Sequence, residues 1–266
     1  QMLIRDGGGY ASGPAVMAAW LMRIPTAIAE QNALAGNTNR ILGRCVDIIF
    51  VTYEQSKNQF SAGKVMVTGN PVRAAFTERL GNPVSRKSGR QILVFGGSQG
   101  AAAINKTVVA MLPYLQKMKD SLKIVHQTGE RDLVMVKKAY EQYGLDARVS
   151  PFIEDMVSAY ESSDLIICRA GATSLAEITA AGRASILIPF PWAANDHQTL
   201  NARAMVEAGA AEMIQESELT PEALFALVQS LLLDERKLQE MEDKSKKSGR
   251  LDAAAKIVDA CLQLAV

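Results

Sequence analysis

The stretch that decides the fold reads LIIC at 165–168, RAGA at 169–172 and TSLAEI at 173–178. The apolar run is typical of a buried strand, the glycine marks a turn, and the last six residues favour a helix. A strand that turns through glycine into a helix leaves backbone N–H groups unpaired at the positive end of the helix dipole. Such a turn can hold phosphate, so we expect a diphosphate site here.

Glu177 is expected one turn into this helix, where its carboxylate would accept hydrogen bonds from both hydroxyls of a ribose. Ser174 and Glu177 also have the spacing of a capping box, in which serine and glutamate satisfy each other's backbone donors. Taken alone, the pattern favours the capping box. The choice between the two interpretations depends on the rest of the chain.

Strand and helix signals alternate on both sides of this stretch, which predicts parallel sheets with ligand loops at the carboxyl ends of the strands. After the strand at 165–168, the run SILI at 185–188 leads into the polar loop PFPWAANDHQ at 189–198. Further strands are expected at 2–4, 26–29, 46–51, 64–68, 91–95, 122–126, 149–152 and 212–214, with polar loops at 6–14 and 30–40. A helix is expected at 15–22, and from Pro221 onward the signal is entirely helical.

Two Rossmann-like, doubly wound parallel-sheet domains facing a cleft are the predicted α/β architecture. We expect an N-terminal domain at 1–80, a linker at 81–90, a second domain at 91–247, and a C-terminal helix at 248–266 that packs back on the first domain. The first block is short for a doubly wound domain, which usually takes about 100–150 residues. The chain also opens inside a strand, so we expect a further N-terminal portion.

Composition excludes several classes of protein. The 266 residues are 48% hydrophobic with a net charge of +1, and the 29 basic and 28 acidic residues form no basic run, so nucleic acid is not an expected partner. Three widely spaced cysteines indicate a reducing compartment rather than a disulfide framework. No run approaches the length of a membrane span. These features predict a cytoplasmic protein.

The glycine turn at 96–100 follows a strand and opens a helix, but it matches neither the dinucleotide fingerprint nor a P-loop. The following strand ends in His126 rather than an acid, which disfavours NAD. His126 and His197 are each either a buried, satisfied imidazole or a ligand-facing donor, and no metal site is expected. Arg73 either braces a domain interface or binds phosphate.

Seven spaced motifs resemble the MurG family, in order and across essentially the whole chain. They are GGY-x-SGP at 8–14, EQN-x-x-x-G-x-x-NR at 30–40, GNPVR at 69–73, GGSQGA at 96–101, HQTG at 126–129, R-x-GA-x-S-x-x-E at 169–177 and DHQT-x-NA at 196–202. The resemblance implies a GT-B enzyme that transfers N-acetylglucosamine from UDP-N-acetylglucosamine to undecaprenyl-pyrophosphoryl-N-acetylmuramoyl-pentapeptide, converting lipid I into lipid II of peptidoglycan. It also implies peripheral association with the inner face of the plasma membrane.

The resemblance also implies residue roles. Glu177 would bind the ribose hydroxyls, and the backbone at Ile153 would recognise the uracil edge. The diphosphate would be held by Ser98, Ala172, Thr173 and Ser174 with Arg73, and the N-acetylglucosamine by Asn32, His197 and Gln198. The reaction would be an inverting displacement at the anomeric carbon without a cofactor or a protein-bound metal.

Two departures from the family pattern leave the catalytic base unassigned. The family has a further N-terminal segment with a glycine-rich, histidine-containing loop, and its frequent histidine before the glutamate at position 30 is Ala29 in this chain. Two alternatives stay open. The first is a donor-binding lobe without activity of its own, or half of a split glycosyltransferase. The second is a UDP-N-acetylglucosamine 2-epimerase of similar architecture. The helix at 15–22 with Trp20 would either touch a membrane surface or be a core helix.

Overall fold

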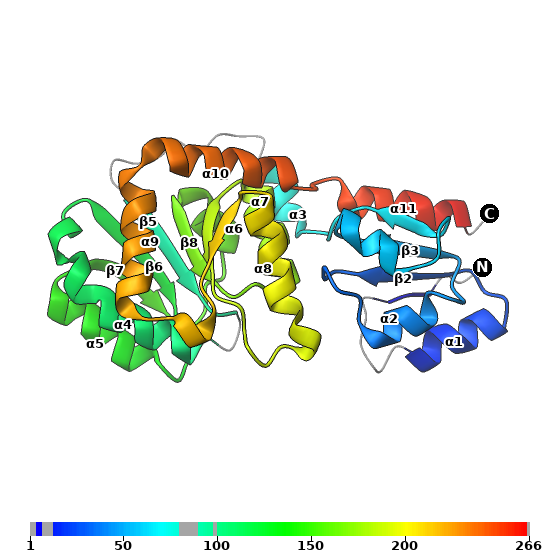
Figure 1. The fold of residues 1–266 in the computed structure, drawn as a ribbon, viewed down its shortest axis with the longest axis horizontal. Coiled ribbons are helices and arrows are strands. Elements are labelled where there is room, and N and C mark those ends of the chain that lie inside the picture. The colour runs from blue at the N-terminus through cyan, green and yellow to red at the C-terminus, as the bar shows by residue number, and fades with distance from the viewer. Residues whose placement is uncertain (1–3, 7–12, 80–89, 98–99, 265–266) are drawn as a thin grey trace.

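A computed structural model describes residues 4–6, 13–79, 90–97 and 100–264. Two sheets lie side by side, one in each lobe, and every pairing within them is parallel (Figure 1). The N-terminal sheet has the order β1-β2-β3-β4, and the C-terminal sheet has the order β10-β9-β8-β5-β6-β7. The predicted α/β architecture with two parallel sheets is therefore confirmed.

The described elements of the N-terminal lobe are short. They are β1 (Ile4–Asp6), α1 (Gly13–Leu21), β2 (Thr26–Glu30), α2 (Asn37–Leu42), β3 (Ile48–Val51), the 3-10 helix η1 (Glu54–Gln59) and β4 (Val65–Val67). The short helix α3 (Ala74–Arg79) leads toward the second lobe. The expected linker falls at 81–90, of which 81–89 lie outside the described residues.

The C-terminal lobe alternates strand and helix. Its strands are β5 (Arg90–Phe95), β6 (Leu122–Gln127), β7 (Asp146–Ser150), β8 (Leu165–Cys168), β9 (Ala184–Leu187) and β10 (Ala211–Met213). Its helices are α4 (Ala102–Leu115), α5 (Leu133–Tyr143), α6 (Met156–Ser162), α7 (Ala172–Ala181), α8 (His197–Glu207), α9 (Pro221–Leu233) and α10 (Glu235–Ser248), with 3-10 turns η2 (Gln116–Met118), η3 (Ala194–Asp196) and η4 (Glu216–Glu218). The last helix, α11 (Ala253–Leu264), returns to the N-terminal lobe (Figure 1).

The C-terminal core has two layers because side chains alternate across each central strand. Ile92 and Val94 of β5 pack into the cluster built with α4, α5 and α9, whereas Leu93 and Phe95 pack into the cluster with α6, α7 and α8. Strand β8 alternates in the same way. Since both faces are covered, the strands read as continuous apolar runs, which explains why the LIIC signal is so clear in the sequence.

Two helices pack against the lobe to which their neighbours in the sequence do not belong. Helix α11 contributes Ile257, Ala260 and Cys261 to a cluster that includes Ala29 of β2 and Phe50 of β3. In the opposite direction, Phe76 of α3 is fully buried in the core of the C-terminal lobe, although α3 precedes the expected linker. The chain therefore crosses between the lobes twice, and each crossing is anchored by buried apolar side chains.

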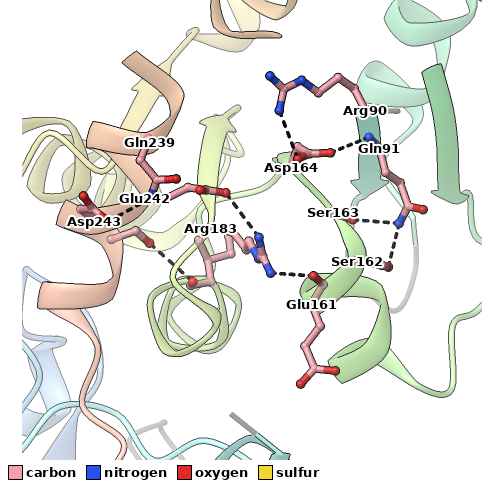
Figure 2. A network of polar contacts seen from close by, with 12 residues as sticks. Arg90, Gln91, Glu161, Ser162, Ser163, Asp164, Arg183, Gln239, Glu242 and Asp243 are labelled. Carbon is pink, nitrogen blue, oxygen red and sulfur yellow. Dashed lines mark hydrogen bonds and ion pairs between the residues drawn. The ribbon is translucent and has the colours of Figure 1, made fainter. Parts of the chain in front are cut away.

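Charged side chains close the amino-terminal edge of the C-terminal sheet (Figure 2). Asp164 accepts a hydrogen bond from the backbone N–H of Gln91 at 2.8 Å and pairs with Arg90. Arg183 donates to the carbonyl of Glu161 at 2.6 Å and pairs with Glu242 of α10 at 3.4 Å. Both arginines lie mostly inside the lobe, so this edge is tied together by interactions within it.

Several local expectations differ from the structure, among them the strand expected at 2–4, which is β1 at 4–6, and the helix expected at 15–22, which is α1 at 13–21. Strand β7 occupies 146–150 instead of 149–152, because Gly144 ends α5 in the left-handed conformation and lets the strand begin early. Residues 37–40, expected in a polar loop, open α2 after Gly36. Within the described ranges, no helix is long and apolar enough to cross a membrane.

Candidate functional site

Glycine turns meet at the carboxyl-terminal edge of the C-terminal sheet, after β5, β6 and β8. Gly100 has a φ of +73°, and a Cβ there would lie 2.1 Å from the carbonyl oxygen of Thr128. Only glycine therefore fits at this position. The close approach holds the β5 turn against the β6 turn, and the β5 turn lines a cavity.

That cavity has a volume of about 500 Å³ and is lined by small residues and a few polar side chains. Gly96, Gly97, Gly100 and Gly171 form its backbone wall, and Ser174 and Gln198 supply polar groups. Arg169 lines it as well, pairing with Glu216 and donating at 3.1 Å to the carbonyls of Ile188 and Pro189. The cavity thus combines close backbone approach with hydrogen-bond donors, as a phosphate-bearing ligand requires.

Helix α7 points its first turn at this cavity. Its N-cap residue is Gly171, and no side chain caps the helix. Ala172, Thr173 and Ser174 are consequently the first three helical residues, and their N–H groups have no intrahelical acceptor. The capping-box interpretation is wrong, because Ser174 lies inside the helix rather than at the N-cap.

Glu177 binds two side chains from distant parts of the chain. Its Oε1 accepts a hydrogen bond from Nε of Arg73 at 3.0 Å and lies 2.9 Å from Nη2 of Arg73 in an ion pair. Its Oε2 accepts a hydrogen bond from the hydroxyl of Tyr160 at 3.2 Å. Glu177 is buried, but the Arg73 side chain is 52% exposed. The carboxylate therefore lies at the boundary between the core and the interlobe surface.

Asn32 belongs to a loop that Glu30 organises. The two carboxylate oxygens of Glu30 accept hydrogen bonds from the N–H and side-chain amide of Asn32, from the N–H of Gly36 and from the side chain of Asn39. Buried Asn201 of α8 then joins this loop to the second lobe: its Oδ1 accepts from the N–H of Ala33 at 2.8 Å and its Nδ2 donates to Asn32 at 3.1 Å. Asn201 places Asn32 beside the C-terminal lobe.

His197 and Gln198 begin α8 after a strained turn. Asn195 and Asp196 have φ values of +53° and +54°, which non-glycine residues rarely adopt. Nδ1 of His197 donates to the carbonyl of Ala194 at 2.7 Å, which leaves Nε2 as the acceptor nitrogen of the neutral ring. Oε1 of Gln198 accepts from the N–H groups of Ala170 and Phe190, so its amide nitrogen remains a donor on the cavity wall.

Ile153 and the glycine turn are connected through Gln127. The N–H of Ile153 donates to Oε1 of Gln127 at 3.1 Å, and Nε2 of Gln127 donates to the carbonyl of Gly97 at 2.9 Å. The loop after β7 is therefore held against the turn after β5. In this arrangement the N–H of Ile153 already has a partner within the protein.

His126 is a structural residue. It is fully buried, with Nε2 3.0 Å from Oδ1 of Asn105 and Nδ1 3.0 Å from the hydroxyl of Tyr140. The Asn105 amide nitrogen donates to Thr128 and Asp132, so its oxygen faces the histidine and the Nε2 proton is donated to it. Burial lowers the pKa of His126 to about 3. Of the two alternatives for this histidine, the structure supports the buried, satisfied imidazole.

The structure brings most of the predicted site residues to one edge of the C-terminal sheet. Ser174 and Gln198 line one cavity, Ala172 and Thr173 open the same helix, Arg73 contacts Glu177, and Asn32 and Ile153 are tied in through Asn201 and Gln127. Ser98 lies outside the described residues. Sequence reasoning assigned no role to Tyr160, Asn201 or Gln127. The last two stand inside recognised motifs, whereas Tyr160 carries no sequence signal.

Comparisons with known proteins agree with this geometry. Residues 91–257 match the glycosyltransferase family 28 C-terminal domain, and residues 2–51 match the glycosyltransferase family 28 N-terminal domain. A UDP-N-acetylglucosamine--N-acetylmuramyl-(pentapeptide) pyrophosphoryl-undecaprenol N-acetylglucosamine transferase from Syntrophus aciditrophicus is 56% identical, over 97% of this chain and 71% of the relative. One with the same name from Myxococcus xanthus is 51% identical, over 97% and 68% of the two chains.

Of two similar solved structures, one belongs to the same family as this chain and the other shares only its fold. The crystal structure of Acinetobacter baumannii MurG has a TM-score of 0.83 and 36% identity, covering 98% of this chain and 74% of its own. A UDP-GlcNAc 2-epimerase from Neisseria meningitidis, bound to UDP-GlcNAc, has a TM-score of 0.70 but only 16% identity, covering 98% and 75%, so it shares the fold alone. The predicted GT-B fold is confirmed. The chain belongs to glycosyltransferase family 28, and within it to the family of MurG and its named N-acetylglucosamine transferase relatives.

Proposed function

We propose that this protein transfers N-acetylglucosamine from UDP-N-acetylglucosamine to undecaprenyl-pyrophosphoryl-N-acetylmuramoyl-pentapeptide. One observation carries the proposal: a single helix, α7, presents its uncapped first turn and, further along, the Glu177 carboxylate at the glycine-lined edge of the sheet. A nucleoside diphosphate has an anionic diphosphate and a ribose with two hydroxyls, which such a helix complements. The names of the relatives support the same donor and acceptor.

The nucleoside part of the donor would lie between Glu177 and Ile153. Glu177 would accept hydrogen bonds from the ribose hydroxyls once Arg73 releases part of its hold on Oε1. The carbonyl of Ile153 would accept from the uracil ring N–H, and its own N–H would exchange Gln127 for a uracil oxygen. Half-exposed Arg73 is free to follow the negative charge of the incoming diphosphate.

The diphosphate would bind at the start of α7. The N–H groups of Ala172, Thr173 and Ser174 and the hydroxyls of Thr173 and Ser174 are donors aimed along a positive dipole end, and Arg73 adds a full charge. Ser98 would also bind the diphosphate, as the family resemblance implies. These groups would stabilise the charge that develops on UDP as it departs.

The sugar would lie toward the interlobe side, where Asn32, His197 and Gln198 supply hydrogen bonds to its hydroxyl and acetamido groups. In the transfer, an acceptor hydroxyl oxygen forms a bond to the anomeric carbon while the bond from that carbon to the diphosphate oxygen breaks. The electron pair of the broken bond leaves with UDP, and the hydroxyl proton passes to a base that we do not assign. Attack from the face opposite the leaving group inverts the anomeric centre.

Peripheral attachment to the inner face of the plasma membrane is part of the proposal. Val16 and Ala19 of α1 are buried, but Trp20, Leu21 and Met22 at its end are 41%, 70% and 71% exposed. An exposed apolar group next to Arg23 suits the boundary between acyl chains and anionic headgroups. Sedimentation with anionic vesicles tests this part, since Leu21→Ser with Met22→Ser should reduce the bound fraction.

The two alternatives predict different products. An epimerase would convert UDP-N-acetylglucosamine to UDP-N-acetylmannosamine without acceptor, and it is less supported because the relatives at 51–56% identity are named transferases. A donor-binding lobe would bind UDP-N-acetylglucosamine and form no product. Incubation with labelled UDP-N-acetylglucosamine, with and without lipid I, distinguishes all three. We expect acceptor-dependent label in lipid II, and its absence under conditions in which the donor binds would overturn the transferase assignment for this chain.

A further inference from the structure

Tyr160 is a buried polar residue that the function described so far does not use. Its side chain is fully buried, and its ring packs on Phe76 and Phe95 with centroids 5.7 Å and 5.8 Å away. Its hydroxyl donates to Oε2 of Glu177 at 3.2 Å. Burial, followed by the nearby Glu177 carboxylate, raises the pKa of Tyr160 well above its usual range, so the phenol keeps its proton and acts as a donor.

The donors around Glu177 are of two kinds. Arg73 comes from the segment after β4, is half exposed, and holds only Oε1. Tyr160 comes from α6 in the same lobe as Glu177, cannot leave the core, and holds only Oε2. A carboxylate has about four lone-pair positions, and the hydrogen bonds from Arg73 and Tyr160 occupy two of them, so a ribose gains room on Oε1 when Arg73 moves. Arg73 is the exchangeable partner and Tyr160 the permanent one.

We infer that Tyr160 is a positioning residue for nucleotide recognition: its hydroxyl fixes the plane of the Glu177 carboxylate so that the remaining lone pairs face a ribose. This inference rests on the proposed function, because it assigns Glu177 to the ribose. When Arg73 turns toward the diphosphate, the Tyr160 hydroxyl is the remaining protein contact described for the carboxylate oxygens. Without it, the carboxylate would rotate about its terminal torsion, which is broad.

The test is Tyr160→Phe, which keeps the ring and removes only the hydroxyl. Calorimetric titration compares UDP with 2′,3′-dideoxy-UDP, which lacks both ribose hydroxyls but keeps the base and the diphosphate. We expect Tyr160→Phe to weaken UDP binding about tenfold, since a hydrogen bond to a charged group is lost. Binding of the dideoxy nucleotide should change by less than about twofold, since its complex makes no use of that hydrogen bond.

Tyr140→Phe is the matched control. Tyr140 is also buried and donates to a buried polar partner, Nδ1 of His126, at 3.0 Å, but it does not contact Glu177. Thermal unfolding should show comparable decreases in melting temperature for the two variants. Only Tyr160→Phe should lower the ratio of the affinity for UDP to the affinity for the dideoxy nucleotide. An equal loss for both nucleotides, or none, would overturn the positioning role.

A second measurement keeps the inference separate from fold defects. In a Glu177→Ala background, Tyr160→Phe should change UDP affinity by less than about twofold, because the two residues act through one contact. A full tenfold loss in that background would contradict the inference. If the wild-type protein does not bind UDP, the proposed function fails and the inference with it, whereas normal wild-type binding with an unaffected Tyr160→Phe variant defeats the inference alone.

Discussion

The two edges of the C-terminal sheet use charged residues in opposite ways. At the amino-terminal edge, Arg183 and Glu242 pair within the lobe and have side chains only 13% and 4% exposed (Figure 2). At the carboxyl-terminal edge, buried Glu177 pairs with Arg73, which is 52% exposed and comes from beyond the lobe. Both are arginine–glutamate pairs. The difference is that Arg183 is enclosed by the lobe, whereas Arg73 is half exposed and, in our proposal, exchanges Glu177 for the diphosphate of the ligand.

The comparison separates stability from binding. A pair enclosed on all sides keeps its geometry, and breaking it leaves a buried charge that water cannot solvate. A pair with one mobile, hydrated member has little effect on unfolding and remains available to respond to a new anion. Substitutions at the two edges should therefore change different observables.

The largest effect is expected at the amino-terminal edge. Arg183→Met removes the guanidinium that holds both Glu242 and the carbonyl of Glu161, and it should lower the free energy of unfolding by about 3 kcal/mol. UDP affinity of the folded fraction should stay within about twofold, because this edge lies at the far ends of the strands. Urea unfolding measures the free energy of unfolding, and calorimetry measures the affinity for UDP. Weaker UDP binding with an unchanged free energy of unfolding would contradict the assignment of this edge to stability.

Glu177→Ala should produce the opposite pattern. Loss of the carboxylate removes the proposed ribose acceptor and should weaken UDP binding about 100-fold, or about 2.7 kcal/mol. Arg73 is half exposed and can be hydrated instead, but the buried Tyr160 hydroxyl loses its acceptor, so the free energy of unfolding should fall by about 1 kcal/mol, less than the loss in binding. Glu212→Ala, which removes a partly buried pair with Lys237 2.8 Å away, is the control. Equal loss of fold and binding would instead make Glu177 a structural residue.

His126 sharpens the comparison, because it lies near the carboxyl-terminal edge yet belongs to a closed network. Burial holds the pKa of His126 at about 3, while an unfolded histidine titrates near pH 6.5. Between these values only the unfolded state gains the proton, so the unfolding free energy decreases as pH falls from about 6.5 toward 3.

For one such group the loss between pH 7 and pH 5 is about 2 kcal/mol. Urea unfolding at pH 5, 6 and 7 should give a shallower pH dependence for His126→Gln than for the wild-type protein. Parallel curves would mean that His126 is not held neutral by the Asn105 and Tyr140 network.

The smallest effects are expected for two helix caps, one at each edge. Asp155 accepts from the N–H of Ser158 at the start of α6, and Asp234 accepts from the N–H of Lys237 at the start of α10. Each change to alanine should cost about 1 kcal/mol of unfolding free energy. Only Asp155→Ala should also weaken UDP binding, by about twofold, because α6 carries Tyr160.

The contribution of Asp155 to the free energy of unfolding should also depend on pH. Hydrogen bonds from the hydroxyl and N–H of Ser158, with Arg79 nearby, lower the pKa of Asp155 to about 2. A lowered carboxyl pKa contributes stability that is present above the unfolded pKa of about 4 and is lost as pH falls through about 2. The penalty of Asp155→Ala in urea unfolding should therefore shrink in acid, and a penalty that is constant down to pH 2 would exclude this origin.

The strands and the glycine turns were predictable because their signals are local. LIIC occupies β8 with the predicted bounds, since a strand covered on both faces needs an unbroken apolar run. The capping box at Ser174 and Glu177 was wrong because the helix starts at Ala172, and boundary shifts of a residue or two change every cap position. Tyr160 and Asn201 act through partners 17 and 169 residues away, which no local pattern reports.

Calorimetric titration with UDP-N-acetylglucosamine, in the absence of added metal and with ADP-glucose as control, tests the central claim most directly. The proposed function predicts saturable binding of UDP-N-acetylglucosamine, because we propose that α7 binds its diphosphate, Glu177 its ribose, and the Asn32 and Gln198 side chains its sugar. ADP-glucose should bind much more weakly, since it presents a different base and lacks the acetamido group. Equal binding of both nucleotide sugars, or binding of neither, would contradict the assignment of this edge of the sheet as a UDP-N-acetylglucosamine site.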